Sequence, residues 1–126
     1  MEKIIVYEKT SCSKSKETIR LLTEAGVPFE IFEYYDTPLD PEKLLDLARK
    51  LGMSLWDLLR TNEPVYAELD LEHQKISERE LAEIMVAHPD LIQRPIVEMG
   101  DFAVLGRPPE KIQAILDRYT SLKVKK

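Results

Sequence analysis

The stretch RPIVEMGDFAVLGR, residues 94–107, predicts a β-hairpin. Two short apolar runs flank Gly100-Asp101, a dipeptide typical of the type II′ turn in two-residue hairpins. With these residues in the turn, Arg94 pairs opposite Arg107, and opposed residues point to the same face of a sheet. Two guanidinium groups there repel each other unless something negative lies near them. Either a structural carboxylate or a bound oxyanion meets this need, because guanidinium groups match oxyanions through paired N–H donors.

The N-terminal part of the chain has the pattern strand, helix, strand. Residues 4–7 form an apolar run, residues 13–25 have helical periodicity, and residues 29–33 favour a second strand. Gly26 follows the helix in the position of a left-handed cap. Two strands joined by one helix in this way are expected to be parallel neighbours with a right-handed connection.

The middle of the chain, roughly residues 40–88, is predicted to be helical. Asp40-Pro41 has the pattern of an N-cap followed by proline at the first helical position. Ser77 with Glu80 forms a capping box, and Pro89 stops the helix that follows it. Pro108-Pro109-Glu110 starts a final helix. The predicted order is therefore β-α-β, a helical block, and β-β-α.

Cys12 is the only cysteine, and it lies where the first strand ends and the first helix begins. Unpaired backbone N–H groups and the positive end of the helix dipole favour thiolate at such a position, and thiolate is the reactive form of cysteine. A buried structural cysteine is the alternative. The polar neighbours Thr10, Ser11, Ser13 and Lys14 favour a functional thiol.

Composition limits the class of protein. The chain has 126 residues, 33% of them charged, and a net charge of -5, which is typical of one globular domain and gives no support to nucleic-acid binding. A single cysteine excludes an internal disulfide and favours a reducing compartment. No membrane-spanning run or signal peptide is apparent. We expect a cytoplasmic protein that is monomeric and binds neither nucleic acid nor membrane.

Four segments together resemble one known family. They are Cys12-Ser13-Lys14-Ser15-Lys16, Leu59-Arg60-Thr61, Leu91-Ile92-Gln93-Arg94-Pro95-Ile96-Val97 and Leu105-Gly106-Arg107-Pro108. In this order and spacing, the chain looks like the glutaredoxin-coupled arsenate reductases, the ArsC family. The resemblance implies an α/β thioredoxin-like fold with a four-stranded mixed sheet. It also implies one domain over residues 1–126, with thioredoxin-like halves at about 1–39 and 90–122 and a helical insertion at about 40–89.

The resemblance also implies a site and a reaction. Cys12 would attack arsenate, and Arg60, Arg94 and Arg107 match the arginines that bind the oxyanion. Ser15 matches a serine near the thiolate, and Pro95 would be the cis proline facing the active-site loop. Glutathione would serve as co-substrate and glutaredoxin as partner, with no metal and no tightly bound cofactor. Because the chain has no second cysteine, the resolving thiol has to come from another molecule.

The chain departs from the family in two places. The family often has a histidine shortly before the cysteine, where this chain has Glu8 in the stretch 7–11, and Lys16 replaces an arginine beside the serine. A carboxylate near the sulfur opposes thiolate formation. Lysine keeps the charge but lacks the planar fork of arginine. The phosphatase-like arsenate reductases, which need Cys-x5-Arg, are excluded because Thr18 occupies the arginine position.

Two other functions stay open at this point. One is a glutathione-linked thiol oxidoreductase that acts on another substrate. The other is a regulator that binds RNA polymerase, as the Spx-type proteins of this fold do. Those regulators usually carry Cys-x-x-Cys, and Ser15 stands at the second position here.

Overall fold

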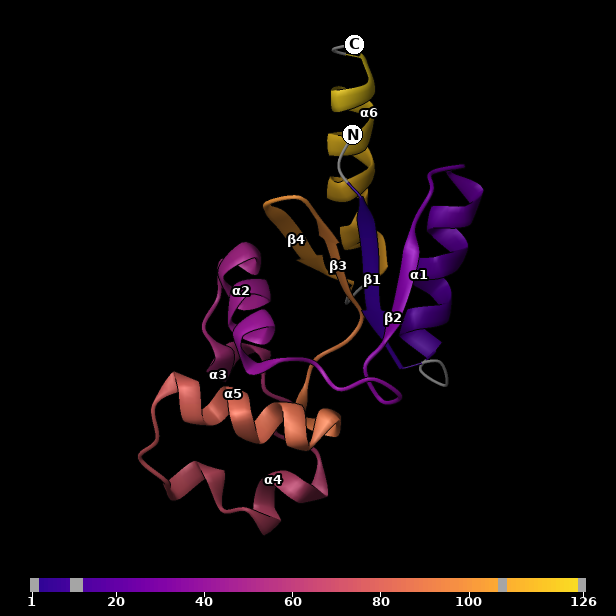
Figure 1. Ribbon diagram of the computed structural model, residues 1–126. Coiled ribbons are helices and arrows are strands. Elements are labelled where there is room, and N and C mark those ends of the chain that lie inside the picture. The colour runs from indigo at the N-terminus through magenta and orange to yellow at the C-terminus, as the bar shows by residue number, and fades with distance from the viewer. Residues whose placement is uncertain (1–2, 10–12, 107–108, 125–126) are drawn as a thin grey trace. The chain divides into compact units, whose positions relative to one another are not determined.

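A computed structural model describes residues 3–9, 13–106 and 109–124 of the chain (Figure 1). Its contacts divide the chain into two compact units. Unit 1 combines Met1–Tyr34 with Arg94–Lys126, and unit 2 is Tyr35–Gln93. The organisation as one domain with an insertion at about 40–89 stays a prediction.

Unit 1 is built on a four-stranded mixed sheet with the strand order β2-β1-β3-β4. The strands are β1 (Ile4–Glu8), β2 (Glu30–Glu33), β3 (Ile96–Met99) and β4 (Phe102–Leu105). Strand β1 is parallel to β2 and antiparallel to β3, and β3 is antiparallel to β4. The order β-α-β followed by β-β-α confirms the predicted α/β, thioredoxin-like fold with a mixed sheet.

The hairpin forms in the predicted register. Val97 pairs with Val104 and Met99 with Phe102, so Gly100 and Asp101 form the turn. Gly100 has a φ of 60°, the conformation that a type II′ turn requires at its first central residue. The N–H of Gly106 donates to the carbonyl of Pro95 at 2.8 Å, which continues the pairing one step beyond the strands.

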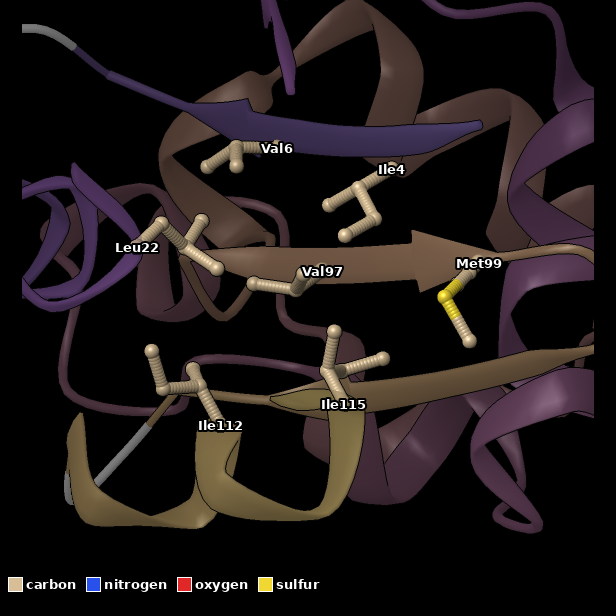
Figure 2. Close-up of a cluster of buried hydrophobic side chains, with 7 residues drawn as sticks. All are labelled: Ile4, Val6, Leu22, Val97, Met99, Ile112 and Ile115. Carbon is tan, nitrogen blue, oxygen red and sulfur yellow. The ribbon is translucent and has the colours of Figure 1, made fainter. Parts of the chain in front are cut away.

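The core of unit 1 lies on one face of this sheet, where α1 (Ser13–Glu24) and α6 (Gln113–Val124) contribute side chains (Figure 2). The cluster consists of Ile4, Val6, Leu22, Val97, Met99, Ile112 and Ile115. Ile4 and Val6 are two residues apart in β1 and therefore point to the same face. This packing fixes α1, and with it the start of the helix that follows Cys12.

The cluster leads to a prediction for stability. Leu22 is 0% exposed, and Leu22→Ala leaves a cavity among these side chains. We expect the free energy of unfolding to fall by about 2 to 5 kcal/mol, as measured by urea denaturation. Ile31 is 50% exposed on the edge strand β2, so Ile31→Ala serves as the control and should lower it by less than about 1 kcal/mol. Equal losses in the two variants would contradict this assignment of the core.

The opposite face of the sheet carries a buried polar pair. The hydroxyl of Tyr7 donates to Oε1 of Glu98 at 2.7 Å, and the Tyr7 ring lies 5.4 Å from the ring of Phe32. Tyr7 is 3% and Glu98 4% exposed. Because a slip of one residue would exchange the two faces, this pair and the apolar cluster together specify the register of β1 against β3.

Unit 2 is helical, as predicted for this part of the chain. Its elements are α2 (Pro41–Leu51), α3 (Leu55–Leu58), α4 (Pro64–Glu68), η1 (Leu71–His73), α5 (Glu78–Ala87) and η2 (Pro89–Leu91). The predicted caps are present: Asp40 accepts a hydrogen bond from the N–H of Glu42, and Ser77 with Glu80 forms a complete capping box. Within the described ranges, no helix is both long and apolar enough to cross a membrane.

The structure differs from the prediction at the last helix. A 3-10 turn, η3 (Pro109–Ile112), comes first, and the α-helix α6 begins only at Gln113. Proline lacks a backbone N–H and fixes its φ, and 3-10 turns are frequent at the ends of α-helices. Ile112 of the 3-10 turn and Ile115 of the α-helix both reach the core, so this segment packs against the sheet over both elements.

Candidate active site

The end of β1, the start of β3 and the end of β4 meet at one edge of the sheet in unit 1, the edge formed by strand ends. Tyr7 near the end of β1 pairs with Ile96 at the start of β3, and Ile96 pairs with Leu105 at the end of β4. Helix α1 begins at Ser13, shortly after β1 ends. The end of β1, the entry to β3 and the exit from β4 are therefore neighbours, with Gly106 following the exit.

Three of the predicted site residues have side chains that lie outside the described part of the chain. Cys12 and Arg107 lie outside the described residues, and for Ser15 the structure describes the backbone within α1. The described chain ends at Lys9 on one side of Cys12 and begins again at Ser13 on the other. The roles of Cys12, Arg107 and Ser15 stay predictions.

Arg94 lies at this edge of unit 1, directly before β3. It is 7% exposed, and the peptide bond between Arg94 and Pro95 is cis, as the family resemblance implies. A charged group so little exposed to water interacts with other charges more strongly than one on the surface. Arg94 therefore provides a buried positive charge at the edge where β1 ends.

Arg60 belongs to unit 2, and its convergence with Arg94 stays a prediction. Its backbone N–H donates to the carbonyl of Leu91 at 2.7 Å, beside an isolated antiparallel bridge between Leu59 and Ile92. Leu59, Leu91 and Ile92 are all buried. Arg60 is thus bonded to the segment 91–93, which continues along the chain into Arg94.

The side chain of Arg60 has an acidic partner that sequence analysis missed. Nη2 of Arg60 lies 3.2 Å from Oε1 of Glu63, and the two side chains are only 20% and 22% exposed. Glu63 also stands at the N-cap of α4 without making a side-chain cap hydrogen bond, so its carboxylate faces Arg60 instead. The three-residue spacing between Arg60 and Glu63 was the sequence signal for this ion pair. It was missed because helical periodicity did not predict the short helix α4.

Glu8, the first departure from the family pattern, is buried at the same edge of unit 1. It is 2% exposed, and its register partner in β2 is Glu33. A buried carboxylate disfavours further negative charge nearby, and a guanidinium favours it. Arg94 therefore favours an anion at this edge, and Glu8 disfavours one in its ionised form. Lys16, the second departure, is exposed on α1.

Thr18 and Gly106 form a close contact that no local sequence pattern indicated. Thr18 is 0% exposed on α1, and a Cβ built on Gly106 would lie 2.8 Å from its Oγ1.

Among the described residues, no group of three or more His, Cys, Asp or Glu side chains is arranged to hold a metal ion.

Comparison with known proteins now identifies the family. Residues 7–115 match the ArsC family. The chain belongs to the ArsC family. It is 42% identical over 116 residues to the uncharacterized protein YfgD of Escherichia coli K12, covering 91% of this chain and 98% of that protein. It is 37% identical over 117 residues to an arsenate reductase of Neisseria meningitidis, covering 92% of this chain and 100% of the relative.

A solved structure of the ArsC family agrees with this assignment. The arsenate reductase from Vibrio cholerae has a TM-score of 0.86 and 36% sequence identity to this chain. The match covers 90% of this chain and 98% of that structure. The predicted ArsC resemblance and the fold it implied are therefore confirmed.

Proposed function

We propose that this chain is an arsenate reductase, an oxidoreductase in which Cys12 is the nucleophile and Arg60, Arg94 and Arg107 bind the oxyanion. Membership of the ArsC family supports this activity, together with relatives named arsenate reductase that align over almost the whole chain. One observation carries the proposal: the segment leading into Cys12, the buried Arg94 and the segment leading into Arg107 meet at one edge of unit 1.

The charges of the reactants explain why arginines are needed. Arsenate and a thiolate are both anions, so they repel each other as the sulfur approaches arsenic. Guanidinium groups offset this charge and hold the oxyanion through paired N–H donors. Arg94 is 7% exposed, and its charge is therefore less screened by water than that of a surface arginine. In this proposal the hydroxyl of Ser15 lies near the Cys12 thiolate, and Pro95 faces the active-site loop.

The first step forms a sulfur–arsenic bond and releases water. The Cys12 thiolate attacks H₂AsO₄⁻, an As–O bond breaks, and one proton from solvent converts the departing oxygen to water, which leaves a Cys–S–AsO₃H⁻ adduct. Arsenic stays As(V) in this step. Its reduction to As(III) takes two electrons, which two thiols supply as they form a disulfide.

The second thiol has to come from outside the chain, because Cys12 is its only cysteine. The glutathione thiolate attacks the sulfur of Cys12, the S–As bond breaks, and its electron pair stays on arsenic, which leaves as arsenite. Glutaredoxin then reduces the mixed disulfide between Cys12 and glutathione and returns Cys12 to its thiol form. Such exchange depends on a reduced thiol pool, so we expect the protein to work in the cytoplasm. In this proposal it acts as a monomer, with glutathione as co-substrate and no tightly bound cofactor.

A coupled assay tests the proposal. Purified protein is supplied with arsenate, glutathione, glutaredoxin, glutathione reductase and NADPH, and NADPH oxidation is followed by absorbance. We expect oxidation that depends on both arsenate and the protein, with arsenite as product. A reaction in which sulfate replaces arsenate is the control for arsenate-independent oxidation.

Two results would contradict arsenate reduction in favour of the other functions. Reduction of a mixed glutathione disulfide without any response to arsenate would indicate a thiol oxidoreductase for another substrate. Co-purification with RNA polymerase together with no reductase activity would indicate a regulator.

Glu63 provides a prediction about the arginine site. In Glu63→Gln the side chain keeps its size and a hydrogen-bond acceptor for Arg60 but loses the charge that competes with the oxyanion. We expect the KM for arsenate to fall about 2- to 5-fold, in line with the modest strength of such ion pairs. Glu83→Gln is the matched control, because Glu83 pairs with Arg79 through a side chain that is 57% exposed. An unchanged or higher KM in Glu63→Gln would contradict a role of Arg60 in binding.

A further inference from the structure

Three chain segments touch at the edge of unit 1 where Arg94 lies. Thr18 of α1 is 0% exposed, and Pro95 and Gly106 are buried beside it. A Cβ on Gly106 would lie 2.8 Å from Oγ1 of Thr18 and 2.9 Å from Cγ of Pro95. Both distances are shorter than real Cβ atoms show, so no side chain fits at position 106 unless its neighbours move.

Gly106 is therefore required by space and not by its backbone conformation. Gly26, Gly52 and Gly100 have positive φ values, between 60° and 72°, whereas Gly106 is not among the residues with positive φ. A glycine next to a strand, at a position that does not need a positive φ, often marks a close approach of another group. Here that group is the side chain of Thr18, together with the proline ring.

We infer that Thr18 is a positioning residue for the oxyanion site. Its buried side chain lies against Gly106 at the exit from β4, where Pro95 at the entry to β3, the residue after Arg94, is the other close neighbour of Gly106. This holds both strand ends against α1, the helix that follows Cys12. The inference rests on the proposed function, and it assigns Thr18 a role through the segments that it packs against.

The shape of Thr18, rather than its hydroxyl, carries this role. Within the described part of the chain, Oγ1 of Thr18 is buried and makes no hydrogen bond. Valine has nearly the same shape without the hydroxyl, so Thr18→Val keeps a side chain of the same size against Gly106. It also removes a buried polar group that lacks a partner, which favours the folded state.

Truncation has the opposite effect on the site. Thr18→Ala leaves a cavity beside Gly106, so we expect the exit from β4 to shift and the oxyanion site to lose its alignment. A small displacement of binding groups reduces affinity strongly. Gly106→Ala disturbs the same contact by adding a methyl group, and Thr18→Ala in that background should restore part of the loss because it removes one of the two clashes.

The experiment measures how arsenate protects Cys12 from alkylation by iodoacetamide, with the thermal unfolding midpoint as a parallel readout. In the wild-type protein, arsenate should slow alkylation in a saturable manner. Thr18→Val should keep the wild-type dissociation constant and unfold at the same or a higher temperature. Thr18→Ala and Gly106→Ala should raise the dissociation constant about 10-fold, and Thr23→Ala, at an exposed position of the same helix, should leave it unchanged.

The possible results distinguish failure of the proposed function from failure of the inference about Thr18. Lack of protection in the wild-type protein would contradict the proposed function and this inference with it. Protection of the wild type with the same dissociation constant in Thr18→Ala would overturn the inference alone. A Thr18→Val protein that binds arsenate as weakly as Thr18→Ala would also overturn it, because the hydroxyl would then be the active group. If Thr18→Ala fails to fold, Thr18→Val and Gly106→Ala are compared instead. The inference then requires the wild-type dissociation constant in Thr18→Val and a raised one in Gly106→Ala, and either opposite result overturns it.

Discussion

Replacing Cys12 with serine is expected to abolish arsenate-dependent turnover and to leave arsenate binding intact. A serine hydroxyl is almost fully protonated at neutral pH and is a weak nucleophile without an adjacent base. It also cannot form the disulfide through which glutathione and glutaredoxin restore the enzyme. We expect kcat to fall by about 10⁴-fold or more, to the background of the coupled assay. The oxyanion site consists of guanidinium groups, which this substitution does not change.

Two measurements on the Cys12→Ser protein separate chemistry from binding. Arsenate binding is followed by isothermal titration calorimetry, and the dissociation constant should stay within about threefold of the wild-type value. Thiolate absorbance in the ultraviolet, which we expect in the wild type, should be absent from this variant because Cys12 is the only cysteine. Turnover equal to that of the wild type would remove the thiol mechanism altogether.

The hairpin shows which parts of the fold can be predicted from sequence. Gly100-Asp101 sets the turn, and the apolar runs on either side set the strands, so the pairing of Val97 with Val104 follows from neighbouring residues alone. The same holds for the cap at Asp40 and the capping box at Ser77, where side chain and backbone are within three residues of each other. Local chemistry is sufficient in these cases.

The contacts that shape the candidate site are less accessible to such reasoning. Thr18 and Gly106 are far apart in the sequence, and only packing in three dimensions shows that one requires the other to be glycine. Glu63 lies three residues from Arg60, but α4 is too short for a periodic signal. The place of Cys12 before a helix and the hairpin pairing of Arg94 with Arg107 indicate these residues from sequence, whereas Arg60 is indicated by the family resemblance alone.

Arg94→Lys is the second substitution with a large expected effect. Lysine keeps the positive charge and has a stem that fits a buried position, but it lacks the planar fork with which guanidinium holds two oxygens at once. Hydrogen bonds to charged groups contribute about 1.5 to 3 kcal/mol each, so the loss of one to the oxyanion should reduce kcat/KM about 10- to 100-fold. Arg94 is 7% exposed, so water cannot readily replace the missing contact.

The matched control for this prediction is Arg20→Lys, in the same unit. Arg20 has a side chain that is 50% exposed and pairs with Glu17 and Glu24 on the surface of α1, so its replacement should change kcat/KM by less than about twofold. Alkylation of Cys12 without arsenate tests whether the thiol itself has changed, and thermal unfolding tests the fold. If Arg94→Lys retains the wild-type kcat/KM while both readouts are normal, Arg94 does not bind the oxyanion bidentately. The shared sheet edge would then serve the stability of unit 1 and not the recognition of arsenate.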